Sequence, residues 1–299
     1  MKRSQRGFFY GDTTDLIRLD GVTLTDTVYG QGRVDWHFHE DDYFTFLLEG
    51  GVCEGNRKEV YECVAGDLLF HNWQDRHYNI GSKRYTRGFH VELTDHWYER
   101  LGIPANLTEG SMQLADPLIK SQMYSIFREA KLSGQGAQLG VDAALAQLFG
   151  ILGKMREARG GARKPDWVGR IREMFRDGSE DWSLVRLANE VNVHPAHLSR
   201  EFSRYFHTGL GDYLRLVKVN RAMRLLCDPE RLLTEIAFEC GFADQSHFIR
   251  SFRNYYGVTP LEYRRLMGVG GPRAHFGGVG GDGSGLDVKN ILFFFPVRV

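Results

Sequence analysis

The chain has no excess charge of either sign, few cysteines and no long apolar run. Its 38 Lys and Arg balance its 38 Asp and Glu, so overall charge does not favour a polyanionic partner and any nucleic-acid surface must be local. The four cysteines, Cys53, Cys63, Cys227 and Cys240, include no CxxC pair, which favours reduced thiols over a Cys53–Cys63 bridge. No stretch approaches the ~20 apolar residues of a membrane helix. We expect a soluble, cytoplasmic protein.

The first part of the chain, to about Leu93, is rich in short aromatic and β-branched segments. Gly-containing turn signals separate these segments, at residues 30–32, 49–51, 53–56 and 65–67. Many short strands at regular spacing predict a sandwich or a barrel. The expected strands are Thr23–Tyr29, Tyr43–Leu48, Val60–Val64, Asp67–His71 and Arg87–Leu93.

Helical periodicity begins after Pro117. One apolar stripe runs from Ile119 to Ala130, and a second runs from Val141 to Met155. These helices either cover their own barrel or pair two subunits, and the second interpretation predicts a homodimer. A basic, Gly-containing stretch up to Pro165 is typical of a linker. We expect domains over 1–158 and 166–267, a linker over 159–165, and a glycine-rich, disordered tail over 268–299.

Residues 234–265 predict a short helix, a turn at Gly241 and a longer helix with arginines on one face, the layout of a helix-turn-helix. A weaker copy lies about 50 residues upstream, where Ser183 can cap the first helix and Pro195 can open the second. The matching pairs are His197 with His247, Arg200 with Arg250, Phe202 with Phe252 and Tyr213 with Tyr263. Two such helix-turn-helix units in one chain, which we call reading heads, can bind two successive DNA grooves.

The outer faces of the two longer helices carry residues suited to DNA. Arginine can bond guanine through two hydrogen bonds and glutamine can bond adenine in the same way. Other basic side chains are better suited to phosphates, and Arg204, Lys218, Arg221 and Arg253 are expected in that role. The alternative is that both are ordinary solvated helix faces. The expected buried faces are Leu198, Phe202 and Tyr205 or Phe206, and then Phe248, Phe252 and Tyr255.

Residues 166–266 resemble the AraC/XylS family of bacterial transcription regulators, most densely at Ile236-Ala237, Gly241-Phe242, Phe248, Phe252, Gly257, Pro260 and Tyr263-Arg264. The resemblance implies a long central helix over Leu210–Leu226 between two helix-turn-helix units. It also implies base contacts by Ala196, His197, Arg200, Gln245, Ser246 and Arg250. His207 departs from the family, which has glycine there. Either histidine adopts the left-handed backbone, or the first head sits at a different angle.

Members of this family commonly place a cupin-like β-barrel before the DNA-binding domain, and residues 35–50 and 66–79 resemble the two cupin motifs. In metal-binding cupins, the histidine positions are those of His37, His39 and His77, whereas Tyr43 occupies the carboxylate position. We expect no resident cofactor and interpret these residues as hydrogen-bonded barrel histidines, with metal binding as the alternative. An effector pocket suited to an aromatic or polyhydroxylated ligand would be lined by Trp36, His37, His39, Phe46, Trp73 and His77, although packing explains them equally well.

The sequence therefore predicts an α+β, two-domain protein: a cupin-like β-barrel with a helical dimerisation segment, then an all-α double helix-turn-helix. The function predicted is a ligand-responsive transcription factor, not an enzyme. Its partners would be double-stranded DNA, a small-molecule effector and RNA polymerase, with no membrane. The alternatives are a metal-dependent cupin enzyme with a DNA-binding appendage and an effector-independent DNA binder. Activation and repression are both open.

Overall fold

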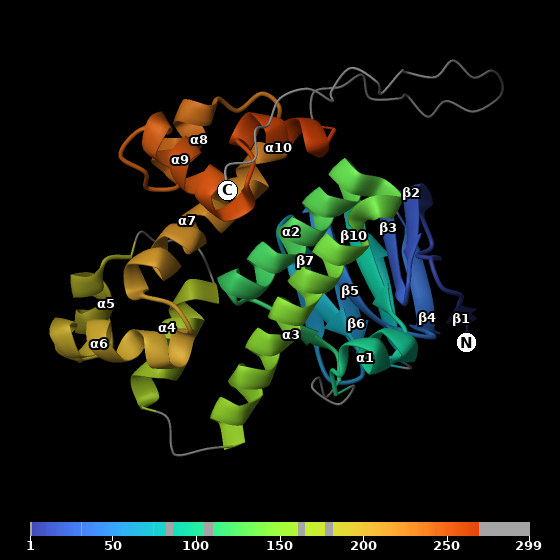
Figure 1. The fold of residues 1–299 in the computed structure, drawn as a ribbon, viewed down its shortest axis with the longest axis horizontal. Helices are drawn as coiled ribbons and strands as arrows, with labels where there is room; N and C mark the ends of the chain where they lie inside the picture. The colour runs from blue at the N-terminus through green and yellow to red at the C-terminus, as the bar shows by residue number, and fades with distance from the viewer. Residues whose placement is uncertain are drawn as a thin grey trace.

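The computed structural model describes residues 2–30, 32–73, 75–81, 86–104, 110–160, 165–176 and 182–268. It shows a strand-rich N-terminal part and a helical C-terminal part (Figure 1). The predicted tail from residue 269 onward lies outside the described residues, as do residues 161–164 of the predicted linker. Helix α3 (Gln138–Gly160) continues through the first two linker positions, because Lys, Met, Arg, Glu and Ala in its last turns are good helix formers.

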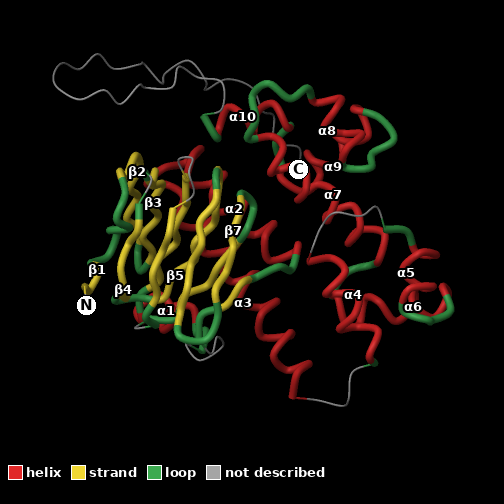
Figure 2. Tube along the Cα trace, turned by 180° about the vertical axis from the view of Figure 1, so that it is seen from behind, coloured by secondary structure: helices red, strands yellow, loops and turns green. Residues whose placement is uncertain are grey.

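Two sheets build the N-terminal part (Figure 2). The six-stranded sheet has the order β11-β8-β5-β10-β3-β2, and the five-stranded sheet has the order β1-β4-β9-β6-β7. Neighbouring strands are antiparallel except for the pair β1 and β4. The strands are β1 (Lys2–Ser4), β2 (Asp12–Leu19), β3 (Val22–Tyr29), β4 (Arg33–His39), β5 (Asp42–Glu49), β6 (Gly51–Asn56), β7 (Val60–Val64), β8 (Leu68–His71), β9 (His77–Gly81), β10 (Thr86–Leu93) and β11 (Met112–Gln113). The five predicted strands correspond to β3, β5, β7, β8 and β10.

The turn predicted at residues 53–56 was wrong, because Gly51–Asn56 is strand β6. Gly55 is there for close packing: a Cβ on it would collide with the ring of Tyr78 on the paired strand β9. The same strand buries the carboxylate of Glu54, which is 4% exposed. A glycine that admits a neighbouring ring looks identical in sequence to a glycine that turns the chain.

All four cysteines are free thiols.

The two faces of the six-stranded sheet have different partners. Along β5, Phe44 and Phe46 point to the covering helices, whereas Tyr43 and Thr45 point to the interior between the sheets, as a strand period of two requires. The ring of Phe46 lies 4.6 Å from that of Tyr124 on helix α2 (Pro117–Ser133). Each aromatic ring buried in this way contributes about 1.5–3 kcal/mol. The covering layer is α1 (Asp95–Leu101), α2, the short η2 (Gly134–Ala137) and α3.

One helical stretch, Pro117–Arg156, is long and apolar enough to cross a membrane by length and composition, and 44% of its window is buried. The stretch comprises α2, η2 and α3. Its Met123, Leu145 and Leu148 belong to the same core as the sheet residues Phe44 and Phe89. Packing on the sheet therefore accounts for its apolar composition.

The helical part consists of α4 (Asp166–Arg176), α5 (Leu184–Glu190), α6 (Pro195–Phe206), α7 (Leu210–Leu226), α8 (Leu233–Glu239), α9 (Gln245–Tyr256) and α10 (Pro260–Leu266). Helix α7 has the bounds predicted for the central helix. We call α5–α6 the first head and α8–α9 the second head. Among the described residues, the first head and α4 have their own hydrophobic core, which contains Trp167, Leu198 and Phe202.

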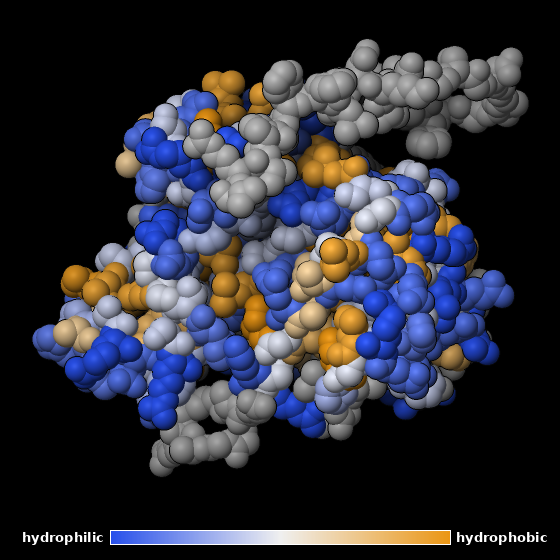
Figure 3. All heavy atoms as spheres, in the orientation of Figure 1, coloured by the Kyte–Doolittle hydropathy of each residue, from blue (hydrophilic) through white to orange (hydrophobic). Residues whose placement is uncertain are grey.

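The second head shares its core with the N-terminal part. The ring of Tyr124 on α2 contacts the rings of Tyr256 and Tyr263, at 5.1 and 5.9 Å between centroids. Arg128 Nη1 donates to the Tyr256 carbonyl at 2.7 Å, and Cys227 donates to the Leu48 carbonyl at 2.9 Å. Figure 3 shows a mostly hydrophilic surface with hydrophobic residues reaching it where the two parts of the molecule meet. The second head is therefore anchored to the sheet domain through α2.

Candidate functional site

The outer face of α9 is exposed and its inner face is buried. Asp244 begins the helix by accepting from the backbone N–H of His247 at 2.6 Å. Ser246 and Arg250 are exposed, while Gln245 is half-buried and its side-chain oxygen accepts from the Thr234 hydroxyl on α8 at 2.6 Å. The hydrogen bond from Thr234 orients the Gln245 amide on the outer face. The buried tyrosine is Tyr256, not Tyr255 as predicted, and it packs with Phe248 and Phe252.

Helix α6 repeats this arrangement in the first head. His194 caps it by accepting from the Ala196 N–H, and Pro195 occupies its first turn. Ala196, His197 and Arg200 are exposed, and Arg200 Nη2 lies 3.5 Å from His197 Nδ1. Its buried residues are Leu198, Phe202 and Phe206, so the apolar face continues through Phe206 rather than Tyr205.

The turns of the two heads match in backbone detail. Asn192 at φ 55° and Gly241 at φ 75° take the left-handed conformation in corresponding turns. In the first head, the Val193 N–H donates to the Ala188 carbonyl, and in the second, the Phe242 N–H donates to the Ala237 carbonyl, both at 2.9 Å. The duplication inferred from residue types is therefore also a duplication of geometry.

The helix ends match as well. His207 ends α6 at φ 59°, and Gly257 ends α9 at φ 70°. Each donates its N–H to a carbonyl four residues earlier, Ser203 at 3.0 Å and Arg253 at 2.9 Å. Histidine therefore adopts the left-handed cap that the family fills with glycine.

The four side chains predicted to contact phosphates occupy two kinds of environment. Arg204 and Arg253 are exposed on the outer sides of α6 and α9. Lys218 donates to the Gly241 carbonyl at 2.7 Å and so stabilises the turn of the second head. Arg221 lines a crevice between α2 and α7. The geometry favours Arg204 and Arg253 as the phosphate contacts.

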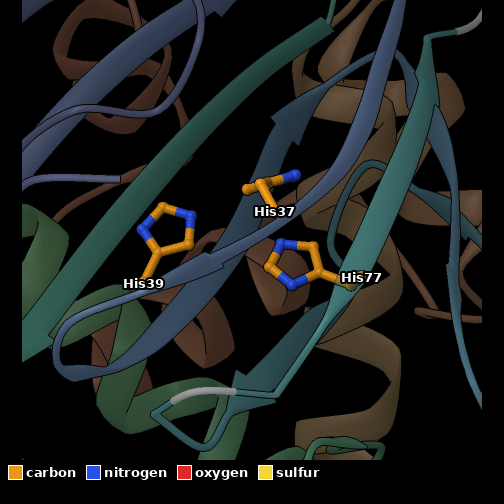
Figure 4. A group of neighbouring side chains, drawn as sticks. All are labelled: His37, His39 and His77. Carbon is orange, nitrogen blue, oxygen red and sulfur yellow. The ribbon is translucent and has the colours of Figure 1, made fainter. Parts of the chain in front are cut away.

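A cavity of about 210 Å³ lies between the two sheets. His37, His39 and His77 line it and point toward one another (Figure 4). The other three predicted pocket residues do not line it: Trp36 is 37% exposed beside Tyr78, Trp73 is 51% exposed, and Phe46 belongs to the core under α2. The lining residues that sequence reasoning missed are Phe9, Tyr10, Tyr29, Arg33, Val34, Tyr43, Thr45, Leu47, Val52, Glu54, Asn79, Thr86 and His90, together with Gly30, Gly32 and Gly81.

Burial sets the protonation of the cavity. Desolvation lowers the pKa of His37 to about 4 and the pKa values of His39 and His90 to about 3. Desolvation also raises the pKa of Glu54 to about 8, although the hydrogen bond from Asn79 opposes the rise. Near neutral pH, these imidazoles are uncharged, so the cavity offers neutral hydrogen-bonding groups.

Two groups of side chains in or beside the cavity could hold a metal ion. His37, His39 and His77 form the group expected from the cupin motif, and Glu54, His71 and His77 form a second. Within each group, one ligand atom per residue lies within 4.8 Å of the others. The alternation of side chains along β5 and β10 could have predicted that Thr45 and His90 face the cavity. Glu54 had no such signal, because it was assigned to a turn.

Comparison with known proteins bears on the C-terminal part of the chain. The family model described as "Helix-turn-helix domain" matches residues 187–266. Residues 187–266 are a helix-turn-helix domain of the AraC type. The transcriptional regulator GadX of Escherichia coli K12 is 34% identical over 86 residues, which are 29% of this chain and 31% of GadX. The regulator GbdR of Pseudomonas aeruginosa PAO1 is 33% identical over 93 residues, which are 31% of this chain and 25% of GbdR.

The match thus spans about a third or less of the length of these curated relatives. Among solved structures, unsaturated fatty acid-bound ToxT from Vibrio cholerae is 14% identical, with a TM-score of 0.33 covering 85% of this chain and 97% of ToxT. A DNA-binding transcriptional dual regulator from Escherichia coli K-12 is 29% identical, with a TM-score of 0.31 covering 36% of this chain and 97% of that chain.

Proposed function

We propose that this protein is a sequence-specific DNA-binding transcriptional regulator. The observation that carries the proposal is the pair of recognition helices, α6 and α9, whose turns and caps match and whose outer faces are both exposed. Two heads on one chain present two helices to successive major grooves. The proposal assigns base contacts to Ala196, His197, Arg200, Gln245, Ser246 and Arg250.

The proposal assigns different roles to two arginines that are three positions apart on α9. Arg250 lies on the outer face and is assigned to a base edge, and Arg253 is assigned to a phosphate. Arg250→Ala is expected to weaken binding to a site selected from random DNA by about 5- to 150-fold, equivalent to about 1–3 kcal/mol, and to relax discrimination at one base pair. Fluorescence anisotropy on the selected site and its single-base variants measures both effects.

Arg253→Ala is the matched control. It is expected to weaken binding to all sequences equally and to reduce the slope of log affinity against log salt by about 1. An equal loss on all sequences for Arg250→Ala would contradict the base contact, and a base-specific loss for Arg253→Ala would show that the two roles are reversed.

We also propose that a small molecule in the cavity controls DNA binding. The cavity has the volume of about seven waters at ~30 Å³ each, and its polar groups are imidazoles, hydroxyls and the Asn79 amide. Arg33, the one basic side chain among the described lining residues, is half-exposed and paired with Asp35. A neutral, hydroxylated molecule suits these groups better than a carboxylate, which would find no buried cation among the lining residues that the structure describes.

The route from cavity to DNA would run through shared packing. Strand β10 carries His90 on its cavity face and Phe89 on its helix face. Phe89 contacts Phe127 on α2 at 5.3 Å between ring centroids, and Phe127 lies 6.2 Å from Tyr263 beside the second head. A ligand that moves β10 would shift the second head relative to the first.

The effector proposal predicts a thermal shift for the full chain. A neutral sugar or polyol that binds the cavity is expected to raise the melting temperature in a concentration-dependent way. His90→Ala removes a lining imidazole and should reduce that shift. A ligand whose shift does not change in this variant binds elsewhere.

The wider proposal is a cytoplasmic homodimer that recruits or blocks RNA polymerase and has no catalytic activity. Residues 1–158 would sense the effector and dimerise, and residues 166–267 would bind DNA.

A further inference from the structure

We propose that Glu54, His71 and His77 bind one divalent transition-metal ion, such as Zn²⁺ or Co²⁺, in the wall of the N-terminal domain. This site goes beyond the proposed function and does not depend on it. The carboxylate comes from β6 and the imidazoles come from β8 and β9. One carboxylate with two imidazoles is a ligand set that suits such ions.

His71 is the first reason. Its side chain is 1% exposed, yet neither ring nitrogen has a hydrogen-bond partner. A buried polar group left without a partner destabilises the folded state, and such a group in a folded protein calls for an explanation. The ring is held in place by stacking on Tyr43, at 4.2 Å between centroids and 9° between planes. A metal ion would give its nitrogen a partner without moving the ring.

The position of Glu54 is the second reason. Its Oε1 lies 3.3 Å from His71 Nδ1 without forming a hydrogen bond. Two ligands of one tetrahedral zinc ion, with bonds of about 2.0–2.1 Å, also lie about 3.3 Å apart. The other carboxylate oxygen, Oε2, accepts from Asn79 Nδ2 at 2.9 Å, so the carboxylate is oriented.

His77 is oriented in the way that metal-binding histidines usually are. Its Nδ1 donates to the backbone carbonyl of Asp75 at 3.1 Å, which leaves the Nε2 lone pair for the ion. Nε2 now bonds the Tyr43 hydroxyl at 3.0 Å, and the ion would take the place of this hydroxyl.

Charge favours this set over the three histidines His37, His39 and His77. Three neutral imidazoles leave a buried divalent charge without an anion, whereas Glu54 supplies one when the ion displaces its proton. His77 belongs to both sets, so only one of the two sets can bind an ion at a time. Three protein ligands leave at least one coordination position for water or for a donor atom of a molecule in the cavity.

The test measures metal binding by the full chain without a histidine tag. Calorimetric titration of the wild type with Zn²⁺, and absorption titration with Co²⁺, are expected to give one ion per chain. Glu54→Gln and His71→Ala are each expected to weaken binding by more than about 100-fold, beyond the 10- to 100-fold effect of losing an outer partner. His39→Ala is the matched control, from the same cavity but the other set, and should change affinity less than about 3-fold.

Wild-type protein that binds no ion at 100-fold molar excess of Co²⁺ would overturn the proposal. So would loss of binding in His39→Ala with retention in His71→Ala, because that result assigns the ion to the three histidines. X-ray absorption of the zinc-loaded wild type needs no folded variant: two imidazoles and a carboxylate around the zinc support the site, and three imidazoles overturn it.

Discussion

At the scale of the residue, Asp26 on β3 is a buried acid of the sheet domain that contacts two cations, Arg87 and Lys131. It is 1% exposed and accepts from Arg87 at 2.6 and 2.7 Å, while Lys131 of α2 lies 2.7 Å away. Burial alone would raise its pKa, but the hydrogen bonds and charges of Arg87 and Lys131 outweigh burial, and the pKa is lowered. Arg87 also donates to the Met267 carbonyl, so this acid indirectly supports the end of the second head.

The lowered pKa makes stability depend on pH. A carboxyl whose folded pKa lies below its unfolded value of about 3.9 contributes stability above that value and loses it as pH falls through the folded pKa. Asp26→Asn is therefore expected to cost about 3–5 kcal/mol at pH 7, because it removes the buried anion that Arg87 and Lys131 share and leaves Lys131 only the exposed Asp15. The cost should begin to shrink as pH falls below about 4, because the carboxyl of the unfolded chain takes up a proton there while the folded one stays ionised until its own, lower pKa is reached. Urea unfolding at pH 7 and pH 3 measures it.

Asp15→Asn is the control for this prediction. Asp15 contacts the same Lys131 at 3.0 Å, but its side chain is 42% exposed. Because exposed ion pairs contribute about 0–1 kcal/mol, this variant should remain near wild type at both pH values. An Asp26→Asn cost that is equal at pH 7 and pH 3 would show that packing, not charge, is what the substitution removes.

At the scale of the element, we expect substitutions at the ends of α6 and α9 to have opposite effects on stability. A non-glycine residue in the left-handed conformation costs about 1–2 kcal/mol, whereas glycine there loses about 0.5–1 kcal/mol of chain entropy. His207→Gly is therefore expected to stabilise the protein slightly, by up to about 1 kcal/mol.

Gly257→Ala is expected to destabilise by about 2 kcal/mol or more, because it adds strain at φ 70° and its Cβ would collide with the Arg128 guanidinium. That guanidinium is the group that bonds the Tyr256 carbonyl. Thermal unfolding of both variants checks the pair. Shifts of the same sign would contradict the capping argument.

Elements with a strong local pattern were predictable from sequence. The five predicted strands and the central helix occur within about two residues of their expected bounds, because alternation and apolar stripes are local properties. Strands β1, β2, β4, β6, β9 and β11 were not predicted. Strand β6 shows why: Gly55 and the buried Glu54 resemble a turn until Tyr78 of another strand is brought beside them.

The candidate sites also differ in how far the sequence could predict them. The outward residues of α9 follow from helix phase, so Arg250 and Ser246 could be placed from sequence. The cavity and the second metal-binding group could not, since Glu54, His71 and His90 come from three strands whose pairing the sequence does not state. The cupin resemblance located His37, His39 and His77, but it also suggested Trp36 and Trp73, which point away from the cavity.

At the scale of the whole molecule, the two heads are held differently. The second head and α10 share a core with the sheet domain, while the first head and α4 have a separate one. Helix α7 belongs to both cores, with Tyr213 in one and Met223 in the other. The distance between the two recognition helices, α6 and α9, is therefore set by α7 and by the contacts that α2 makes at the end of α7 that adjoins the second head.

The second head shares a core with the sheet domain. The parts of the molecule that unfold together are therefore not the same as the successive segments of the chain. A cut in the linker would separate α7–α10 from Tyr124, Phe127 and Arg128, and would expose the apolar surfaces of both fragments to water. Because the first head and α4 have a separate core, we expect them to form the smaller cooperative unit and to open while the rest stays folded. We therefore expect the first head to have lower local stability than the second, which unfolds together with the sheet domain.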